Sequence, residues 1–208
     1  SFRDDIDRRD FKMNSLAVSL NANNYGELID YHNGLRDINE KIINTPLDSK
    51  LTFSDDPLRI FRAVRFASQL KFKIHENLID SMSILSDRIK ILYSERIVDE
   101  LHKILMSNKP SLAFITLDKV GILELIIPEL TNLKGIEEVE GQKHKDNFYH
   151  TLEVLDNICR STKNLWLRWA ALLHDIGKAP TKKFNKKIGW TFHGHEFEGS
   201  KMVYKLFK

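Results

Sequence analysis

The chain has 208 residues, of which 42% are hydrophobic, so it can bury a sizeable core and is not expected to be disordered. Lysine and arginine together number 32 and aspartate and glutamate 29, and the resulting net charge of +3 indicates an anionic partner only weakly. The sequence has no run of about 20 apolar residues and no signal-peptide pattern, so we expect no membrane partner. The single cysteine, Cys159, excludes an internal disulfide and fits a cytoplasmic protein.

The first 45 residues predict short elements only. Residues 14–20 favour a short helix, and residues 27–31 and 35–38 favour two extended segments. Asn33 and Gly34 between these segments form a dipeptide typical of a hairpin. Because the chain begins with Ser1 and ends inside a helical pattern, we expect it to be a piece of a longer protein.

The remainder of the chain is predicted to be helical. Apolar residues recur at helical spacing in the segments 56–70, 77–91, 94–106, 111–120, 122–127, 148–158, 165–176 and 196–208. A polar, glycine-containing stretch over 131–145 predicts a domain boundary. A long loop before the last helix is rich in lysine, with Lys178, Lys182, Lys183, Lys186 and Lys187.

Arginines near the start of the chain form the first candidate binding site. Arg8 and Arg9 precede Asp10 and Phe11, and Asn14 follows. Guanidinium groups suit a triphosphate, because each offers several donors in a planar fork. The alternative is a solvated, charged lead-in.

Asp56 and Arg59 form the second candidate. Their spacing predicts that they share one face of a helix, with Arg62 further along. A carboxylate only accepts hydrogen bonds and a guanidinium only donates them, so the pair could bind the amine and ring nitrogen of cytosine or adenine. Uracil and guanine present a carbonyl instead of the amine and would be rejected. The alternative is that Asp56 caps the helix and forms an ion pair with Arg59.

Four segments resemble motifs of class II tRNA nucleotidyltransferases, in the same order. They are RRDFKMNSLA at 8–17, DYHNGLRD at 30–37, DDPLRIFRAVRFA at 55–67 and SERIVDEL at 94–101, which resemble RRDFTINALA, DxxGGxxDL, EDPLRxxRAxRFA and ERIxxEL. The resemblance implies a polymerase that uses protein side chains to select CTP or ATP for addition to RNA 3′ ends. Either CCA addition to tRNA or poly(A) polymerase activity fits these motifs.

The resemblance also implies roles for individual residues. Asp56 and Arg59 match the base-reading pair, Arg9 and Asn14 match positions near the triphosphate and sugar, and Gly34 matches a glycine of a flexible turn. This chain differs from the family motifs at four positions, where it has Lys12, Ser15, Asn33 and Asp55.

The Mg²⁺-binding Asp-x-Asp of the family precedes the Arg-Arg-Asp-Phe segment and is not recognisable here. Asp5 and Asp7 have the spacing, but no strand or glycine-rich segment comes before them. Two-metal phosphoryl transfer needs such carboxylates. We therefore expect this chain alone to be inactive as a polymerase.

Histidines in the second half predict a metal site. His150, the adjacent His174 and Asp175, and additionally His193 and His195 could supply ligands for a divalent transition metal. The alternative for the His-Asp pair is a hydrogen-bonded core histidine. The pattern resembles HD-type metal-dependent phosphohydrolases, although their distal aspartate is not recognisable before the end of the chain.

Together these features predict a mainly α fold with three parts. Residues 1–45 are expected to be the end of a nucleotidyltransferase head with a short hairpin, 46–130 a helical neck that reads the nucleotide and binds RNA, and 131–208 an all-helical HD domain. A tRNA or another RNA 3′ end is the expected partner. An HD phosphohydrolase and a non-catalytic RNA-binding module are the alternative functions.

Overall fold

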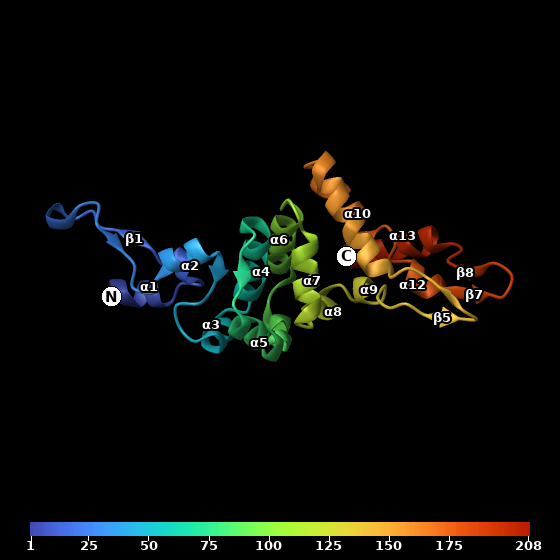
Figure 1. The fold of residues 1–208 in the computed structure, drawn as a ribbon, viewed down its shortest axis with the longest axis horizontal. Helices are drawn as coiled ribbons and strands as arrows, with labels where there is room; N and C mark the ends of the chain where they lie inside the picture. Colours follow the sequence, from blue (N-terminus) through green and yellow to red (C-terminus); the bar gives the residue numbers. More distant parts are fainter. The chain divides into compact units, whose positions relative to one another are not determined.

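The computed structural model describes residues 1–208, which form two compact units, Ser1–Ile104 and Leu105–Lys208 (Figure 1). Each unit consists mainly of helices, with four two-stranded sheets along the chain. The predicted mainly α fold is confirmed. No helix combines the length and apolar character needed to cross a bilayer.

The first unit begins with short elements that surround a small antiparallel sheet. They are α1 (Phe2–Asp7), the 3-10 helix η1 (Lys12–Asn14), β1 (Ala17–Val18), the 3-10 helix η2 (Ala22–Asn24), β2 (Leu28–Ile29) and α2 (Gly34–Glu40). The helix predicted over 14–20 is wrong, because Ala17 pairs with Ile29 and Val18 with Leu28 in an antiparallel ladder. The backbone groups of this segment are thus satisfied by a strand further along the chain.

The strand predicted over 35–38 is also wrong, because these residues form part of α2. The Asp30 carboxylate accepts hydrogen bonds from the backbone N–H groups of Gly34, at 2.7 Å, and Leu35, at 3.0 Å. These N–H groups would otherwise have no partner at the start of a helix. Gly34 itself is buried against η1, where a Cβ would overlap the carbonyl oxygen of Lys12.

The rest of the first unit packs helices around α4. Its elements are β3 (Ile42–Ile43), α3 (Ser49–Asp55), α4 (Leu58–Leu70), β4 (Lys73–Ile74), α5 (Glu76–Ile84), the 3-10 helix η3 (Ser86–Ile91) and α6 (Ser94–Leu105), which runs to the boundary. The helix predicted over 94–106 is confirmed, that over 56–70 begins later, at Leu58, and that over 77–91 is divided between α5 and η3. Strands β3 and β4 form a parallel pair.

A buried ion pair fixes α6 against α4 within the first unit. Arg65 on α4 donates from Nε to Glu100 on α6 at 2.7 Å, and its Nη1 donates to Gln69 at 3.0 Å. Both Arg65 and Glu100 are buried, and Lys103 provides a second cation at 2.9 Å from Glu100. A shift of α6 would separate these partners and leave a buried charge uncompensated, which is costly. The network therefore sets the position of α6 against α4.

The second unit contains α7 (Ser111–Lys119), α8 (Ile122–Ile126), α9 (Pro128–Thr131), β5 (Glu138–Val139), β6 (Gln142–Lys143), α10 (Asn147–Ser161), α11 (Leu165–Leu173), α12 (Lys178–Thr181), β7 (Lys183–Asn185), β8 (Gly189–Thr191) and α13 (His195–Leu206). The predicted helices of this half are confirmed, except that the one over 165–176 ends earlier, at Leu173. The lysine-rich segment was expected to be a loop, but it includes α12 and the antiparallel hairpin β7–β8.

Arg168 is a buried cation in the second unit that has backbone carbonyls as partners. Its Nη1 donates to Leu105 at 2.6 Å and Ser107 at 2.9 Å, and its Nη2 donates to Thr162 at 2.8 Å and Cys159 at 3.2 Å. Two of these carbonyls lie at the C-terminal end of α10, where the partial negative charge of a helix favours a cation. Arg168 therefore fixes the junction between α10 and α11.

Candidate nucleotide-binding cavity and metal centre

A cavity of about 450 Å³ in the first unit contains most of the residues predicted to bind a nucleotide. Its lining consists of Asp5, Arg8, Arg9, Asp10, Asp56, Leu58, Arg59, Arg62 and Arg96. Arginines from α4, α6 and the segment after α1 thus converge on one space, which suits a polyanionic ligand. The structure therefore brings together the predicted residues Arg9, Asp56, Arg59 and Arg62.

Asp56 and Arg59 reach the cavity from either side of a break between two helices. The prediction that both lie on one helical face is wrong, because Asp56 ends α3 in an extended conformation and α4 begins at Leu58. Asp56 Oδ1 accepts the Leu58 N–H at 3.1 Å, as the capping alternative predicts, but Oδ2 pairs with Arg96 at 3.2 Å and not with Arg59. Pro57 fits this break because its fixed φ suits the start of a helix.

The Arg59 side chain is held mainly by backbone carbonyl groups. Nη2 donates to the carbonyl of Arg8 at 2.8 Å and Nη1 to that of Thr52 at 3.4 Å, while the exposed Asp55 carboxylate lies 3.6 Å away. Carbonyl oxygens orient a guanidinium group without neutralising its charge. Arg59 is therefore preorganised and remains electrostatically available to a ligand in the cavity.

Asp10 positions two of the predicted residues, although it was not itself predicted as part of the site. It is buried, and its Oδ2 forms an ion pair with Arg62 at 2.6 Å. Its Oδ1 accepts a hydrogen bond from Asn14 Nδ2 at 3.0 Å. Asn14 therefore does not line the cavity. It binds Asp10, which in turn binds Arg62. An aspartate within a run of arginines was the sequence signal that could have identified this role.

Arg96 is another cavity residue that was not predicted. It lies in the first turn of α6, whose position the Arg65–Glu100 pair sets. Its bond to Asp56 leaves that carboxylate with an unused lone pair, since the two oxygens together accept about four hydrogen bonds. Asp56 can therefore bind Arg96 and a ligand donor at the same time.

Asp5 and Asp7 do not form a free pair of metal ligands. Both lie on α1 rather than on a strand. Asp5 binds Arg8 at 2.6 Å and Arg9 at 2.9 Å, and these hydrogen bonds lower the pKa of Asp5. Asp7 binds His32 at 2.7 Å. These two carboxylates do not fit the Mg²⁺ site of a two-metal polymerase.

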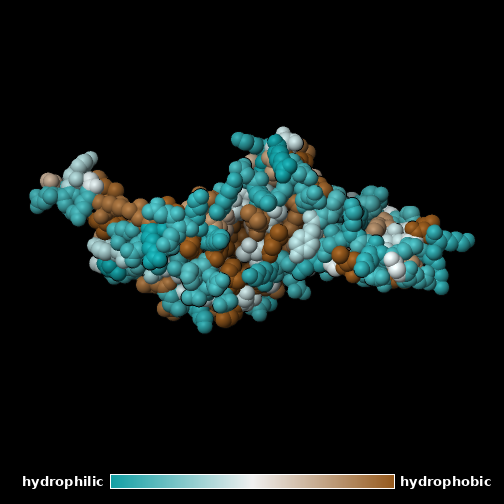
Figure 2. Space-filling model, in the orientation of Figure 1, coloured by the Kyte–Doolittle hydropathy of each residue, from teal (hydrophilic) through white to brown (hydrophobic).

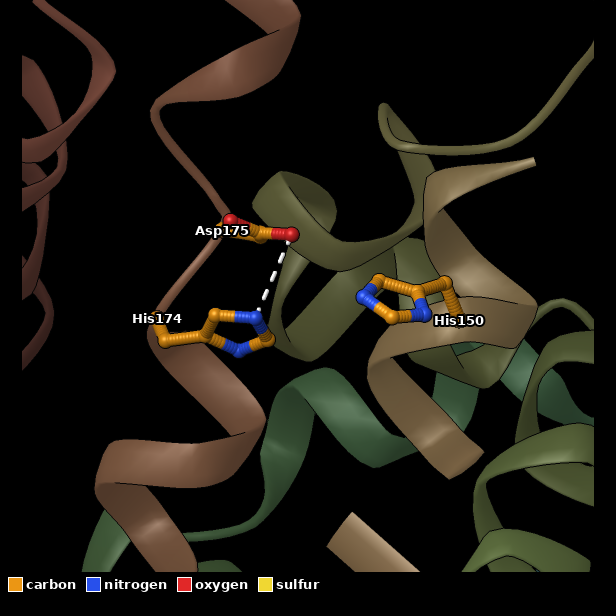
Figure 3. Close-up of side chains that lie close together, drawn as sticks. All are labelled: His150, His174 and Asp175. Carbon is orange, nitrogen blue, oxygen red and sulfur yellow. Dashed lines mark ion pairs between the residues drawn. The ribbon is translucent and has the colours of Figure 1, made fainter. Parts of the chain in front are cut away.

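The second unit brings His150, His174 and Asp175 together (Figure 3). His150 lies on α10, whereas His174 and Asp175 follow directly after α11, and one ligand atom from each residue lies within 4.8 Å of the others. Two imidazoles and a carboxylate fit a divalent ion such as Mn²⁺, Fe²⁺, Ni²⁺ or Zn²⁺. His174 Nδ1 lies 2.8 Å from the carbonyl of Ala171, and a proton on Nδ1 leaves Nε2 as the ligand atom.

Asp175 stays ionised at neutral pH although it is buried. Burial alone would raise its pKa, but hydrogen bonds with His174, at 3.2 Å, and Lys178, at 2.7 Å, outweigh burial and lower the pKa to about 2. The same bond to Asp175 raises the pKa of His174. The structure therefore offers an anionic ligand at the centre of the cluster.

The remaining predicted ligands are placed differently. His195 is the first residue of α13, and its Nε2 lies 3.7 Å from Asp175 Oδ1. His193 is exposed and outside the cluster. The approach of α13 depends on Gly177, because a Cβ there would overlap the carbonyl oxygen of His195 and lie 2.6 Å from the nitrogen of Gly199.

Comparison with known families matches three consecutive parts of the chain. Residues 1–44 match the poly A polymerase head domain, residues 71–134 match the family described as "Probable RNA and SrmB- binding site of polymerase A", and residues 147–208 match the HD domain. Along its length the chain is therefore similar to proteins that combine a poly A polymerase head, an RNA-binding region and an HD domain.

Individual relatives agree with this similarity. The chain is 31% identical to the A-adding tRNA nucleotidyltransferase of Deinococcus radiodurans, over 99% of this chain and 48% of the relative. It is 34% identical to the multifunctional CCA protein of Verminephrobacter eiseniae, over 99% of this chain and 49% of the relative. The Bacillus stearothermophilus CCA-adding enzyme, solved with CTP, superposes with a TM-score of 0.55 and 31% identity over 59% of this chain and 30% of that chain. The chain thus spans about half the length of these curated relatives.

Proposed function

We propose that this chain is the nucleotide-selecting and RNA-binding part of a cytoplasmic tRNA nucleotidyltransferase, which adds CMP or AMP from CTP or ATP to RNA 3′ ends. The observation that carries the proposal is the arginine-lined cavity that also contains Asp56 and Arg59. The family match and the tRNA-directed activities named for the relatives support it. The proposal includes the division into the end of a head domain at residues 1–45, a helical neck at 46–130 and an HD domain at 131–208.

Base selection follows from the chemistry of the two side chains. Asp56 accepts a hydrogen bond from the exocyclic amine of cytosine or adenine, and Arg59 donates to the adjacent ring nitrogen. Uracil and guanine place a carbonyl opposite Asp56, so two acceptors face each other and remain unpaired. One pair of side chains therefore admits CTP and ATP and rejects UTP and GTP.

The remaining arginines suit the triphosphate. Arg9 and Arg62 line the same cavity, and Asp10 orients Arg62. A guanidinium group can bind phosphate oxygens through two parallel hydrogen bonds, which fixes both the position and the orientation of the nucleotide. Carboxylates other than Asp5 and Asp7 would hold the Mg²⁺ that assists phosphoryl transfer. The role proposed for these 208 residues is therefore selection and positioning.

An incorporation assay tests the proposal. These 208 residues are placed behind a catalytic segment that carries the Asp-x-Asp carboxylates, and each labelled nucleotide is offered with a tRNA that lacks its terminal CCA. We expect incorporation of C, of A or of both, without U or G. Incorporation of A alone would identify a poly(A) polymerase or A-adding type. Incorporation of all four nucleotides alike, or of none, would contradict the proposal and favour a plain RNA-binding module.

The His150, His174 and Asp175 cluster favours a second activity, that of an HD-type phosphohydrolase. A divalent ion held by these residues would supply Lewis-acid activation for hydrolysis of a phosphate ester. Lys178 pairs with the ionised Asp175 at 2.7 Å and fixes its orientation. Metal titration of the chain with Mn²⁺ and Ni²⁺ should give one bound ion, which His150→Ala and Asp175→Asn lose. An unchanged stoichiometry in both variants would contradict a metal role for the cluster.

A further inference from the structure

Two adjacent hairpins of the second unit form a positively charged surface outside both sites described above. We define the hairpin surface as residues 137–145, which include β5 and β6, and residues 182–191, which include β7 and β8. The two segments contain six lysines and three glutamates. All three glutamates lie in 137–145, so residues 182–191 carry only positive charge.

The three glutamates neutralise only half of these lysines. Glu137 pairs with Lys182, Glu138 with Lys143 at 3.0 Å, and Glu140 with Lys186 at 3.7 Å. The lysines that remain without an ion pair are Lys145, Lys183 and Lys187, and each of them is exposed. The surface therefore presents an excess of positive charge that its own residues do not neutralise.

Aromatic packing makes the hairpin surface a defined structure rather than a mobile loop. Phe184 and Trp190 face each other across β7 and β8 with ring centroids 5.4 Å apart, and Trp190 also contacts His144 at 4.9 Å. Trp190 Nε1 donates to the carbonyl of Gln142 at 3.1 Å, which ties β8 to β6. Gly189, at φ +81°, permits the close approach, because a Cβ there would overlap the side chain of Gln142.

The alternation of side chains along β7 places Lys183 on the solvent side of the hairpin surface. Side chains along a strand point to opposite faces in turn. Phe184 is half-buried against Trp190, so Lys183 and Asn185 on either side of it are exposed. Most of the surface of the segment around β7 and β8 is hydrophilic in the view of Figure 2.

We propose that the hairpin surface binds the phosphate backbone of RNA, through Lys145, Lys183 and Lys187. The proposal rests on the proposed function, which supplies RNA as the polyanion. Ammonium groups bind phosphates as point charges without base specificity, as expected for a surface that positions an RNA rather than reads it. The surface lies outside residues 71–134, which match the RNA-binding family, so it adds a second contact region.

A membrane surface is the competing partner for exposed lysines. Interfacial binding requires apolar side chains beside the charges, so that they can enter the acyl region. Within residues 182–191 the strongly exposed apolar side chain is Ile188 alone, because Phe184 and Trp190 pack within the platform. The composition of the surface therefore favours RNA.

The test is a salt titration of RNA binding by the 208-residue chain. Binding of a fluorescent tRNA without its terminal CCA is measured by anisotropy at several salt concentrations, for the wild type and for Lys183→Gln/Lys187→Gln. Each phosphate contact contributes about 0.7 to 0.9 to the slope of log K against log salt. We expect the double variant to reduce the magnitude of this slope by about 1.5, from two lost contacts. The control, Lys163→Gln/Lys205→Gln, makes the same charge change at exposed positions of the same unit and should leave the slope unchanged.

The outcomes separate the inference from the proposed function. If wild-type binding is salt-dependent and both double variants have its slope, the hairpin inference is wrong while RNA binding stands. If the wild type does not bind tRNA, the RNA partner in the proposed function fails as well. Binding to vesicles that contain phosphatidylserine, lost only in the Lys183→Gln/Lys187→Gln variant while its RNA slope stays unchanged, would assign the surface to membranes and overturn the inference. Unchanged circular dichroism melting of the variants shows that they fold.

Discussion

Asp10 and Asp37 show how two buried carboxylates of the first unit differ at the residue scale. Asp10 is engaged by Arg62 and Asn14, and it orients an arginine that lines the cavity. Asp37 on α2 is equally buried, but its Oδ2 has no hydrogen-bond partner. Burial raises the pKa of Asp37, with Lys12 opposing the shift only in part. The ionised form of Asp37 is therefore poorly compensated in the fold, whereas Asp10 is a positioning residue.

We predict that Asp37→Asn stabilises the protein at neutral pH. An acid with a raised native pKa binds its proton more tightly when folded, so wild-type stability falls as pH rises from about 3.9, the unfolded pKa, through the raised native pKa. Asparagine removes this dependence, and the gain at pH 7 should be about 1 kcal/mol. Urea unfolding at pH 4 and pH 7 measures the unfolding free energy of both proteins.

The opposite sign is expected for Asp30→Asn, because the pKa of Asp30 is lowered in the fold and its carboxylate caps α2. Equal effects of the two substitutions would contradict this account.

At the element scale, sequence periodicity located the long helices but not the short elements. In segments such as 94–106 and 111–120, apolar residues recur at helical spacing within the segment itself, so the helix can be predicted without knowing its partners. Strands of two or three residues depend on a partner elsewhere, so β1, β3 and β7 were not predicted. Helix α2 was missed because its start depends on capping by Asp30, and Asn-Gly favours a hairpin equally well.

Some residues of the candidate cavity could be predicted from the sequence, and others could not. Arg9, Asp56, Arg59 and Arg62 were named from the sequence, and the structure places all of them around one cavity. Arg96 was not named, since its approach to Asp56 depends on the packing of α6 against α4. Contacts between distant helices are not encoded in local spacing.

Two neighbouring glycines should respond oppositely to alanine. Gly177→Ala places a methyl group on the carbonyl oxygen of His195, which would push α13 and His195 away from Asp175. We expect a loss of about 2 kcal/mol or more in unfolding free energy, as for an overpacked core, together with weaker Mn²⁺ binding. In Gly199→Ala the new Cβ meets Gly177 at 3.5 Å, an ordinary contact, and alanine favours the helix by up to about 1 kcal/mol. Thermal unfolding and metal titration compare the two variants. A destabilised Gly199→Ala beside an unaffected Gly177→Ala would refute the packing argument.

Arg168 should be the most sensitive cation of the second unit. Arg168→Met retains much of the apolar volume but leaves four backbone carbonyl groups, two in buried and two in part-buried hydrogen bonds, without their guanidinium donor. We expect it to lower the unfolding free energy by about 3 kcal/mol. Arg168→Lys should lose less, because the ammonium group keeps the charge and three donors. The control Arg160→Met changes an exposed arginine on α10 and should have little effect. Chemical denaturation measures all three, and similar values for Arg168→Met and Arg160→Met would contradict the role of the buried guanidinium.

At the scale of the whole molecule, the two units carry different chemistry. The first contains the arginine-lined cavity with Asp56 and Arg59, and the second contains a cluster suited to a divalent ion and the hairpin surface. The family match covers parts of both units. We therefore propose nucleotide selection for the first unit and a separate metal-dependent role for the second.

Base selection by Asp56 can be measured as the ratio of kcat/KM for CTP to that for UTP in the incorporation assay. Asp56→Asn keeps the size of the side chain but adds an amide donor that can face the uracil carbonyl. We predict that this substitution lowers the ratio by about 10- to 100-fold, the equivalent of one unpaired buried polar group. The control Asp87→Asn changes an exposed carboxylate that pairs with Lys90 outside the cavity and should leave the ratio intact. If the ratio is the same in Asp56→Asn as in the wild type, Asp56 does not read the base and the account is wrong.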